Sequence, residues 1–125
     1  MRGRLYELPY ASFPALVVPE ADIRAMGTGD YPADAEVQNR ARAGPREGSS
    51  DWGMVYGELL SFDDPEERLP AFDGLEGFYP DQESFYVRVL IPATLAETGT
   101  TVLVWAYVVE SSSGRYLPGG RWPAP

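Results

Sequence analysis

Two segments late in the chain show the clearest alternation of side-chain character. In residues 84–95, "SFYVRVLIPATL", one alternating set is wholly apolar and the other contains Arg88. In residues 100–111, "TTVLVWAYVVES", both sets are apolar, which predicts an interior strand covered on each face. The connection between the segments has hairpin length, so we expect the two strands to be antiparallel neighbours.

Three other segments also have strand character. Residues 3–8, "GRLYEL", predict a short strand. Residues 9–19, "PYASFPALVVP", contain three prolines, which confine them to extended or edge geometry. In residues 52–62, "WGMVYGELLSF", Met54, Tyr56 and Leu60 alternate with Val55 and Leu59, which predicts another strand.

One helix start is well marked within "DDPEERLPAFDGLEG", residues 63–77. Asp64 suits the N-cap, Pro65 suits the first helical position, and Glu67 stands at capping-box spacing. The predicted apolar stripe steps by three residues along one face: Leu69, Phe72 and Leu75.

Pro70 interrupts this helical pattern. A proline removes one backbone hydrogen bond and crowds the preceding turn, at a cost of about 3 kcal/mol in a regular interior. We therefore expect two short turns that meet at Leu69–Pro70, the second ending at Glu76 with Gly77 as its terminator.

The segment from residue 20 to residue 51 differs in composition from its surroundings. It is rich in Ala, Gly, Asp, Glu, Arg and Ser and has no period of two. We interpret it as a surface insertion in a single domain spanning residues 1–125, with one helical turn from Asp34. A lid over a site is the functional alternative. Short strands with one broken helix predict the α+β class, as a small mixed β-barrel with a short helix packed against it.

Composition excludes several functions. The formal charge is -9, with no basic stripe, which disfavours binding to nucleic acid or to an anionic membrane. The chain has no cysteine and no histidine, so thiolate and imidazole chemistry are excluded. No apolar run approaches about 18 residues and no signal-peptide pattern opens the chain, so we expect a cytoplasmic protein. The acidic run at 63–67 does not match a calcium loop.

Glu76 is the most interesting carboxylate. At the C-terminal end of a helix, unpaired carbonyls disfavour the ionised form, and neighbouring apolar side chains desolvate it further. Both effects raise a carboxyl pKa toward the range that a general acid or base requires. The alternative is an ordinary solvated surface glutamate, because glutamate is seldom buried.

Other candidates lie on the late strands. Tyr86 and Arg88 share one face of their strand, where Arg88 can bind a substrate carboxylate or hold Glu76 ionised. The alternative is a surface arginine that covers a hydrophobic edge. Tyr107 and Trp105 are either ligand contacts or core residues.

The order of several short motifs resembles the γ-glutamylcyclotransferase-like family, also called AIG2-like. These motifs are "GRLYELPYASFPALV", "VYGELLSF", "FDGLEGFY", "YVRV", "VWAYVV" and "GGRW", from Gly3 to Trp122 with the segment 20–51 intervening. The resemblance implies a compact mixed barrel whose cavity holds a γ-glutamyl group, with no metal and no cofactor. By its place in "FDGLEG", Glu76 matches the acid/base glutamate of the family.

The resemblance implies an intramolecular reaction. A γ-glutamyl amino acid or amine closes into 5-oxoproline and releases its amine, while Glu76 moves the proton. We assign contacts with this small-molecule substrate to Tyr6, Tyr86, Arg88 and Tyr107.

One departure from the family is evident at the start. The family opens with a strand and a Tyr-Gly-x-Leu loop, whose N–H groups hold the substrate, whereas this sequence begins "MRGRLYEL". Each lost oxyanion donor costs about 3 kcal/mol in barrier. A catalytically silent binding or interaction domain is therefore the alternative, and a homodimer that covers an open strand edge is a third possibility.

Overall fold

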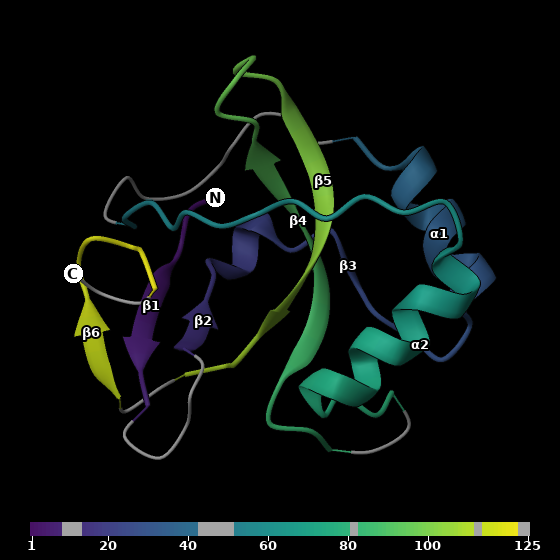
Figure 1. Ribbon diagram of the computed structural model, residues 1–125, viewed down its shortest axis with the longest axis horizontal. Coiled ribbons are helices and arrows are strands. Elements are labelled where there is room, and N and C mark those ends of the chain that lie inside the picture. Colours follow the sequence, from purple (N-terminus) through teal and green to yellow (C-terminus); the bar gives the residue numbers. More distant parts are fainter. Residues whose placement is uncertain (9–13, 43–51, 81–82, 112–113, 123–125) are drawn as a thin grey trace.

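The strands form two antiparallel sheets of three strands each (Figure 1). The computed structural model describes residues 1–8, 14–42, 52–80, 83–111 and 114–122. The first sheet has the order β2-β1-β6, from β1 (Arg4–Glu7), β2 (Pro14–Val17) and β6 (Arg115–Leu117). This confirms the strand predicted within residues 3–8, and β2 lies at an edge, as its prolines indicated.

The second sheet has the order β3-β4-β5. It consists of β3 (Ala25–Met26), β4 (Val87–Thr94) and β5 (Thr101–Val108). The predicted hairpin is confirmed, with eight antiparallel residue pairs from Val87↔Val108 to Thr94↔Thr101. The prediction that the second strand is the interior one is wrong: β4 is central and mostly buried, whereas β5 is an edge strand and mostly half-buried.

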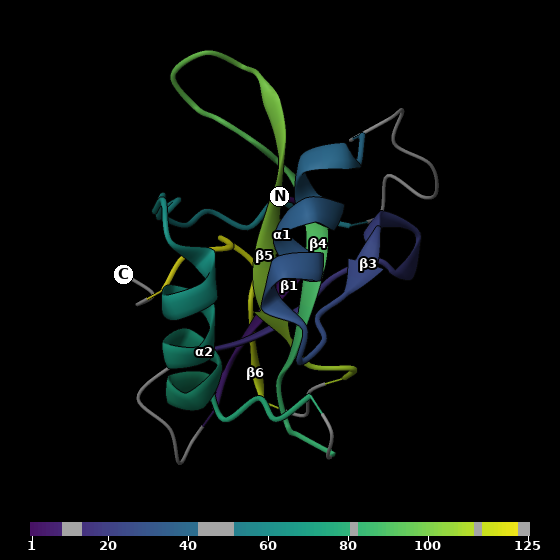
Figure 2. The same ribbon diagram turned by 90° about the vertical axis from the view of Figure 1, so that its right-hand side faces the viewer.

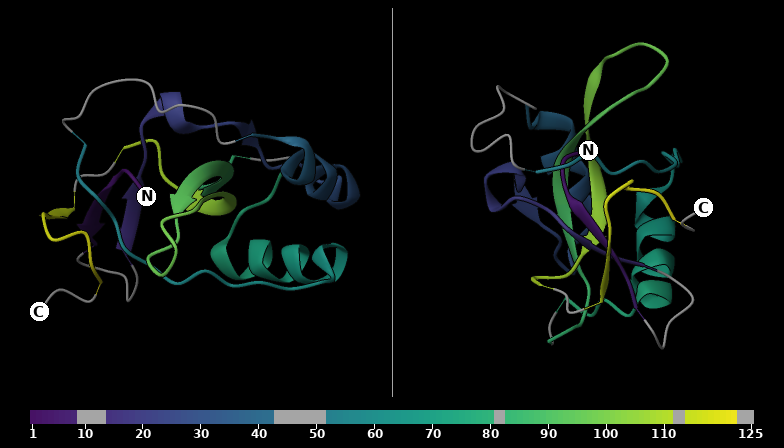
Figure 3. Two further views of the ribbon diagram at one scale, coloured as in Figure 1. Left: turned by 90° about the horizontal axis from the view of Figure 1, so that it is seen from above. Right: turned by 90° about the vertical axis from the view of Figure 1, so that its left-hand side faces the viewer.

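The two faces of the second sheet have different partners (Figures 1 and 3). The first sheet lies on one side of β4 and β5, and the helices α1 (Tyr31–Arg40) and α2 (Pro65–Glu76) lie on the other. Side chains alternate along a strand, so Val89 and Ile91 enter the apolar cluster between the sheets while Arg88 and Leu90 face the helices. Figure 2 shows the two helices in front of and beside this sheet.

The α+β class is confirmed, but a closed barrel is not formed by the strand pairs that the structure describes. The backbone hydrogen bond from Val109 N to Leu16 O, 2.8 Å long, links the end of β5 to β2, and the ladder does not continue beyond it. Within the described residues all ladders are antiparallel, and these residues contain two α-helices where the sequence predicted one helix and a single helical turn.

Helix α2 corrects the expectation of two short turns. It runs without a break from Pro65 to Glu76 through Pro70. Pro70 has no N–H to donate to the carbonyl oxygen of Glu66, four residues earlier. Glu66 is an exposed residue in the first turn, so solvent can donate to this carbonyl instead. The Asp64 side chain makes no capping hydrogen bond, so the capping box is not formed. Gly77 ends the helix in the left-handed region at φ 73°, as predicted.

The buried face of α2 also differs from the predicted stripe. Its buried residues are Leu69 and Asp73, one turn apart, while Leu75 is 80% exposed. The apolar spacing of three residues therefore predicted a buried face that is rotated by part of a turn from the observed one. The observed buried face includes the carboxylate of Asp73.

The strand predicted at residues 52–62 is wrong. Met54 makes an isolated bridge to Arg2, and Tyr56 N donates to Gly120 O, but residues 57–61 are exposed and pair with no strand in the described part of the chain. The alternating pattern was present, but residues 57–61 form no ladder with another strand of the described part of the chain. An apolar alternation predicts a strand only where a partner is available.

The segment 20–51, interpreted as a surface insertion, forms regular structure within its described residues, 20–42. It contains a short 3₁₀ helix (Glu20–Asp22), β3 and the ten-residue helix α1, which begins at Tyr31, before the single turn expected from Asp34. Strand β3 pairs with β4, so this part of the segment contributes to the second sheet. Residues 43–51 lie outside the described residues.

Candidate active site

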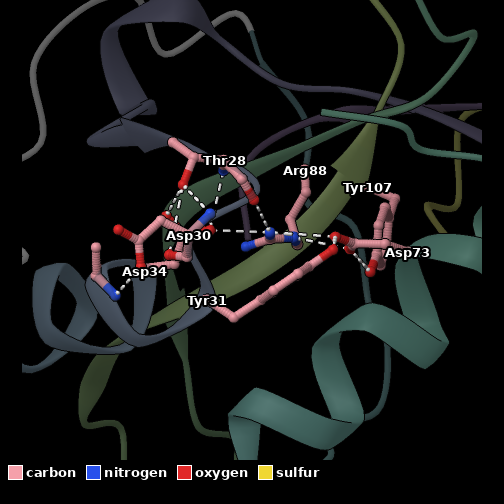
Figure 4. A network of polar contacts seen from close by, with 8 residues as sticks. Thr28, Asp30, Tyr31, Asp34, Asp73, Arg88 and Tyr107 are labelled. Carbon is pink, nitrogen blue, oxygen red and sulfur yellow. Dashed lines mark hydrogen bonds and ion pairs between the residues drawn. The ribbon is translucent and has the colours of Figure 1, made fainter. Parts of the chain in front are cut away.

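A buried arginine stands at the centre of the polar contacts between the second sheet and the helices (Figure 4). The Arg88 side chain on β4 is 0% exposed. Its Nε donates to Asp73 Oδ1 at 2.8 Å, and its Nη2 donates to Asp73 Oδ2, Asp34 Oδ2 and Thr28 O at 3.2, 2.9 and 3.1 Å. One guanidinium therefore joins β4 to α1, α2 and the loop before α1.

Aromatic rings enclose this guanidinium. Its central carbon lies 4.7 Å from the centroid of the Trp105 ring and 5.6 Å from those of Phe78 and Tyr31. Burial lowers the pKa of Arg88, but the hydrogen bonds and charges of Asp73 and Asp34 outweigh it and raise the pKa. Arg88 is therefore a permanent cation held by two carboxylates.

The carboxylate of Asp73 accepts hydrogen bonds from residues of three other elements, α1, β4 and β5. Its Oδ2 accepts from Tyr31 OH at 3.0 Å and its Oδ1 accepts from Tyr107 OH at 2.5 Å, in addition to the bonds from Arg88. Burial, and then the bond to Asp73, raises the pKa of both tyrosines. Both phenols are therefore hydrogen-bond donors throughout the physiological pH range.

The loop between β3 and α1 rests directly on Arg88. Gly27 N donates to Arg88 O at 2.7 Å, and a Cβ at Gly27 would lie 2.8 Å from the guanidinium carbon. Thr28 donates from its N and its Oγ1 to the two carboxylate oxygens of Asp34, at 2.9 and 2.7 Å. Asp30 then caps α1 by accepting from Ala33 N at 3.1 Å. Only glycine at position 27 allows this approach.

Glu76 is the last residue of α2, three residues after Asp73. It is half-buried, and this burial raises the pKa of its carboxyl group. Its charge in turn raises the pKa of Tyr107, so the two side chains lie within electrostatic range. No residue in the described part of the chain donates a hydrogen bond to Glu76, whereas Asp73 accepts four.

The loop before α1 approaches the same end of α2. The position that a Cβ would take on Gly29 lies 3.9 Å from Pro80 Cβ, and Pro80 follows Glu76 by four residues. Gly29 N and Tyr31 N make no hydrogen bond to the described residues. The loop before α1 therefore lies beside the segment that follows α2.

The predicted substrate-binding residues lie in two environments, and Tyr107 takes part in both, because its ring also packs against the apolar cluster that contains Tyr86. Tyr107 and Arg88 are register partners across β4 and β5 and meet through Asp73. Tyr86 is buried in an apolar cluster and donates from its OH to Pro14 O at 3.0 Å. Tyr6 packs against the same cluster from β1, with its ring centroid 5.7 Å from that of Tyr116.

Two readings of Arg88 can now be compared with the structure. Arg88 is fully buried, so its interpretation as a surface arginine that covers a hydrophobic edge is wrong. Its hydrogen bonds go to Asp73, Asp34 and Thr28, so Glu76 is not its ion-pair partner.

Sequence reasoning missed Asp73, Asp34 and Tyr31. Asp73 had a usable signal, because it follows Leu69 by four residues and so shares the buried face of a helix. Asp34 and Tyr31 had none, since they belong to a segment without periodicity. No cluster of three or more Asp or Glu residues suited to a metal ion occurs in residues 1–8, 14–42, 52–80, 83–111 and 114–122.

The structure thus describes a small α+β protein with a lone desolvated carboxyl group beside a buried ion-pair network. The model of the family "Gamma-glutamyl cyclotransferase, AIG2-like" matches residues 26–124. This match covers most of the chain, and the protein belongs to that family. Searches of curated proteins and of solved structures found no similar chain. No helix in the described part of the chain is long and apolar enough to span a membrane.

Proposed function

We propose that the protein is a γ-glutamylcyclotransferase that converts a γ-glutamyl amino acid or amine into 5-oxoproline and the free amine, with Glu76 as general acid/base. The observation that carries this proposal is the environment of Glu76. Among the described residues it has no hydrogen-bond donor, and burial raises its pKa. A carboxylate that is neither neutralised nor hydrogen-bonded by the protein is free to take a proton from a substrate.

The reaction requires one proton carrier. Glu76 takes a proton from the α-ammonium group of the substrate, and the freed amine attacks the γ-carbonyl carbon. A C–N bond forms within the ring, Glu76 returns its proton to the departing nitrogen, and the bond to that nitrogen breaks. The ring nitrogen gives up its second proton through Glu76, and that proton leaves with the amine as ammonium. Because nucleophile and carbonyl belong to one molecule, the site mainly has to hold the substrate in its ring-closing conformation.

We propose that the loop "MGTGD", residues 26–30, supplies backbone N–H donors to the substrate. The family match begins at Met26, and the loop lies between β3 and a helix N-terminus. Gly29 N and Tyr31 N are unpaired within the described residues and can donate to the carbonyl oxygen as negative charge develops there. Arg88 holds this loop through Thr28 O.

The test is 5-oxoproline release from a panel of γ-glutamyl amino acids and amines. Glu76→Gln should lower turnover by at least about 100-fold, because it removes the proton carrier while preserving the shape of the side chain. Glu67→Gln on the exposed side of the same helix is the matched control and should retain activity. Equal turnover by the wild-type protein and Glu76→Gln would remove Glu76 from the mechanism.

A catalytically silent domain that binds a small ligand is the alternative, and one observation favours it. Arg88 was the expected partner for a substrate carboxylate, but its Nε and Nη2 are already bonded to Asp73 and Asp34. Calorimetric binding of a γ-glutamyl amine, with no 5-oxoproline after prolonged incubation, would support this alternative over the enzyme.

A further inference from the structure

A groove lies on the face of the second sheet opposite to Arg88. Its volume is about 650 Å³, within the range of about 300–1,000 Å³ that is typical of small-molecule sites. The floor includes Val87, Val89 and Val108 from β4 and β5. Val87 and Val89 flank Arg88 in sequence, so their side chains point to the other face of the sheet. The groove is therefore separate from the Glu76 site.

Two large apolar side chains line this groove but remain exposed. Met26 is 54% exposed and Phe85 is 56% exposed. They come from segments far apart in the sequence, one from β3 and one from just before β4. A ligand with an apolar body would bury both, and the gain is about 25 cal/mol for each Å² of apolar surface removed from water.

The charged residues of the groove have one sign. Glu20 and Glu110, both exposed, are the only charged groups among its described lining residues. Arg24 follows the lining residue Ile23 in sequence, but its Nη1 donates to Ala21 O at 2.7 Å. The net charge of -9 adds a general attraction for cations. An apolar floor beside two carboxylates complements a molecule that combines an apolar body with a cationic group.

We propose that this groove binds an organic ammonium ion with an aromatic or aliphatic body. The body packs on Val87, Met26 and Phe85, and the ammonium group lies toward Glu20 and Glu110. This assignment does not depend on the chemistry of Glu76, because the two sites lie on opposite faces of β4.

The test uses three probes with the same body and different charges: 4-phenylbutylammonium, 4-phenylbutanol and 4-phenylbutyrate. Each is titrated into the ¹⁵N-labelled protein, and amide shifts are followed by NMR. Shifts should centre on Phe85, Val87 and Val108. The ammonium probe should bind at least about threefold more tightly than the alcohol, and the carboxylate should bind weakest, as expected for charges near a surface.

Two variants separate the contributions of charge and apolar contact. Glu20→Gln combined with Glu110→Gln should remove the preference for the ammonium probe and leave binding of the alcohol unchanged. Phe85→Ser, at an exposed position, should weaken all three probes while the spectrum stays that of a folded protein. Shifts centred on residues 27–30 and Glu76, or a carboxylate probe that binds as tightly as the ammonium probe, would overturn the proposal. Because no turnover is measured, the result is independent of the proposed reaction.

Discussion

Glu76 and Asp73 lie one helical turn apart on α2, but their surroundings differ. Asp73 accepts from Arg88, Tyr31 and Tyr107, whereas Glu76 has no donor among the described residues. Hydrogen bonds and a nearby cation stabilise an ionised carboxylate, and burial without them destabilises it. The helix therefore carries one carboxylate that is held by hydrogen bonds and one that has no donor in the described residues, and the second is our proposed proton carrier.

The pH dependence of turnover should reflect the raised pKa of Glu76. The ionised carboxylate is the base, so activity should rise with pH through an inflection above the ordinary value of 4.5. The measurement is initial 5-oxoproline release from a saturating substrate across the acid range. An inflection at or below 4.5 would contradict the desolvated site.

The same shift has a consequence for stability. A folded-state pKa above the unfolded value means that ionisation of Glu76 opposes folding, so its cost appears as pH rises from 4.5 through the raised pKa. Glu76→Gln should therefore be more stable than the wild-type protein at neutral pH, and the difference should shrink toward pH 4.5. Urea unfolding across this window checks the sign. A difference that grows as pH falls would contradict it.

At the scale of elements, Arg88 holds α1, α2 and β4 in one arrangement. Arg88→Met leaves Asp73 and Asp34 without their cation in a buried place, and should cost about 3–5 kcal/mol of unfolding free energy. The matched control is Arg68→Met, which removes an exposed pair with Asp64 and should cost less than about 0.5 kcal/mol. Urea denaturation measures both. Equal losses would mean that the buried network contributes no more than a surface ion pair.

The C-terminal end of α2 gives a second test at this scale. Gly77 has φ 73°, and alanine there should cost about 1 kcal/mol, because a Cβ is strained in the left-handed region. Gly74 lies inside the same helix with no atom within 4 Å of the position of a new Cβ, so Gly74→Ala should stabilise by about 0.5–1 kcal/mol. Thermal unfolding of both variants checks the opposite signs. Two losses would mean that α2 does not end as described.

Local patterns predicted some elements and failed for others. The hairpin of β4 and β5 follows from alternation, and the end of α2 at Gly77 follows from the conformational freedom of glycine. The alternation at residues 52–62 forms no strand ladder, and the predicted capping box of α2 is not formed. Helix α1 is locally capped by Asp30, but it has no apolar period that would predict its length. The family match, which begins at Met26, includes this part of the chain. Whether residues 20–51 are an insertion stays a prediction.

At the scale of the whole molecule, the second sheet separates two chemical environments. Its helix-facing side holds the ion-pair network and Tyr107, and its other side holds the apolar cluster and the groove. The buried pairs are shielded from salt, while the chain as a whole has nineteen acidic and ten basic residues, and exposed charges are the ones that salt screens. Added salt should therefore weaken the repulsion between exposed charges of like sign and leave the buried ion pairs almost unchanged.

Raising sodium chloride from about 20 mM to about 300 mM should increase the melting temperature, because screening weakens the repulsion within a protein of charge -9. Differential scanning calorimetry gives the direct measurement. Sodium sulfate is avoided in this test because it also strengthens apolar burial. A lower melting temperature in sodium chloride would mean that exposed ion pairs, such as Arg115 with Glu7, outweigh the repulsion.

The sequence alone determined the α+β class, the β4–β5 hairpin and the end of α2, because these depend on periodicity and on neighbouring residues. The role of Glu76 stays a prediction. The tertiary structure decided that Arg88 is buried and that Asp34 and Asp73 are its partners. Arg88 lies 54 residues from Asp34 and 15 from Asp73. A charged side chain is buried at acceptable cost only where side chains of opposite charge pair with it. These partners are distant in sequence, so no local pattern shows which residues they are.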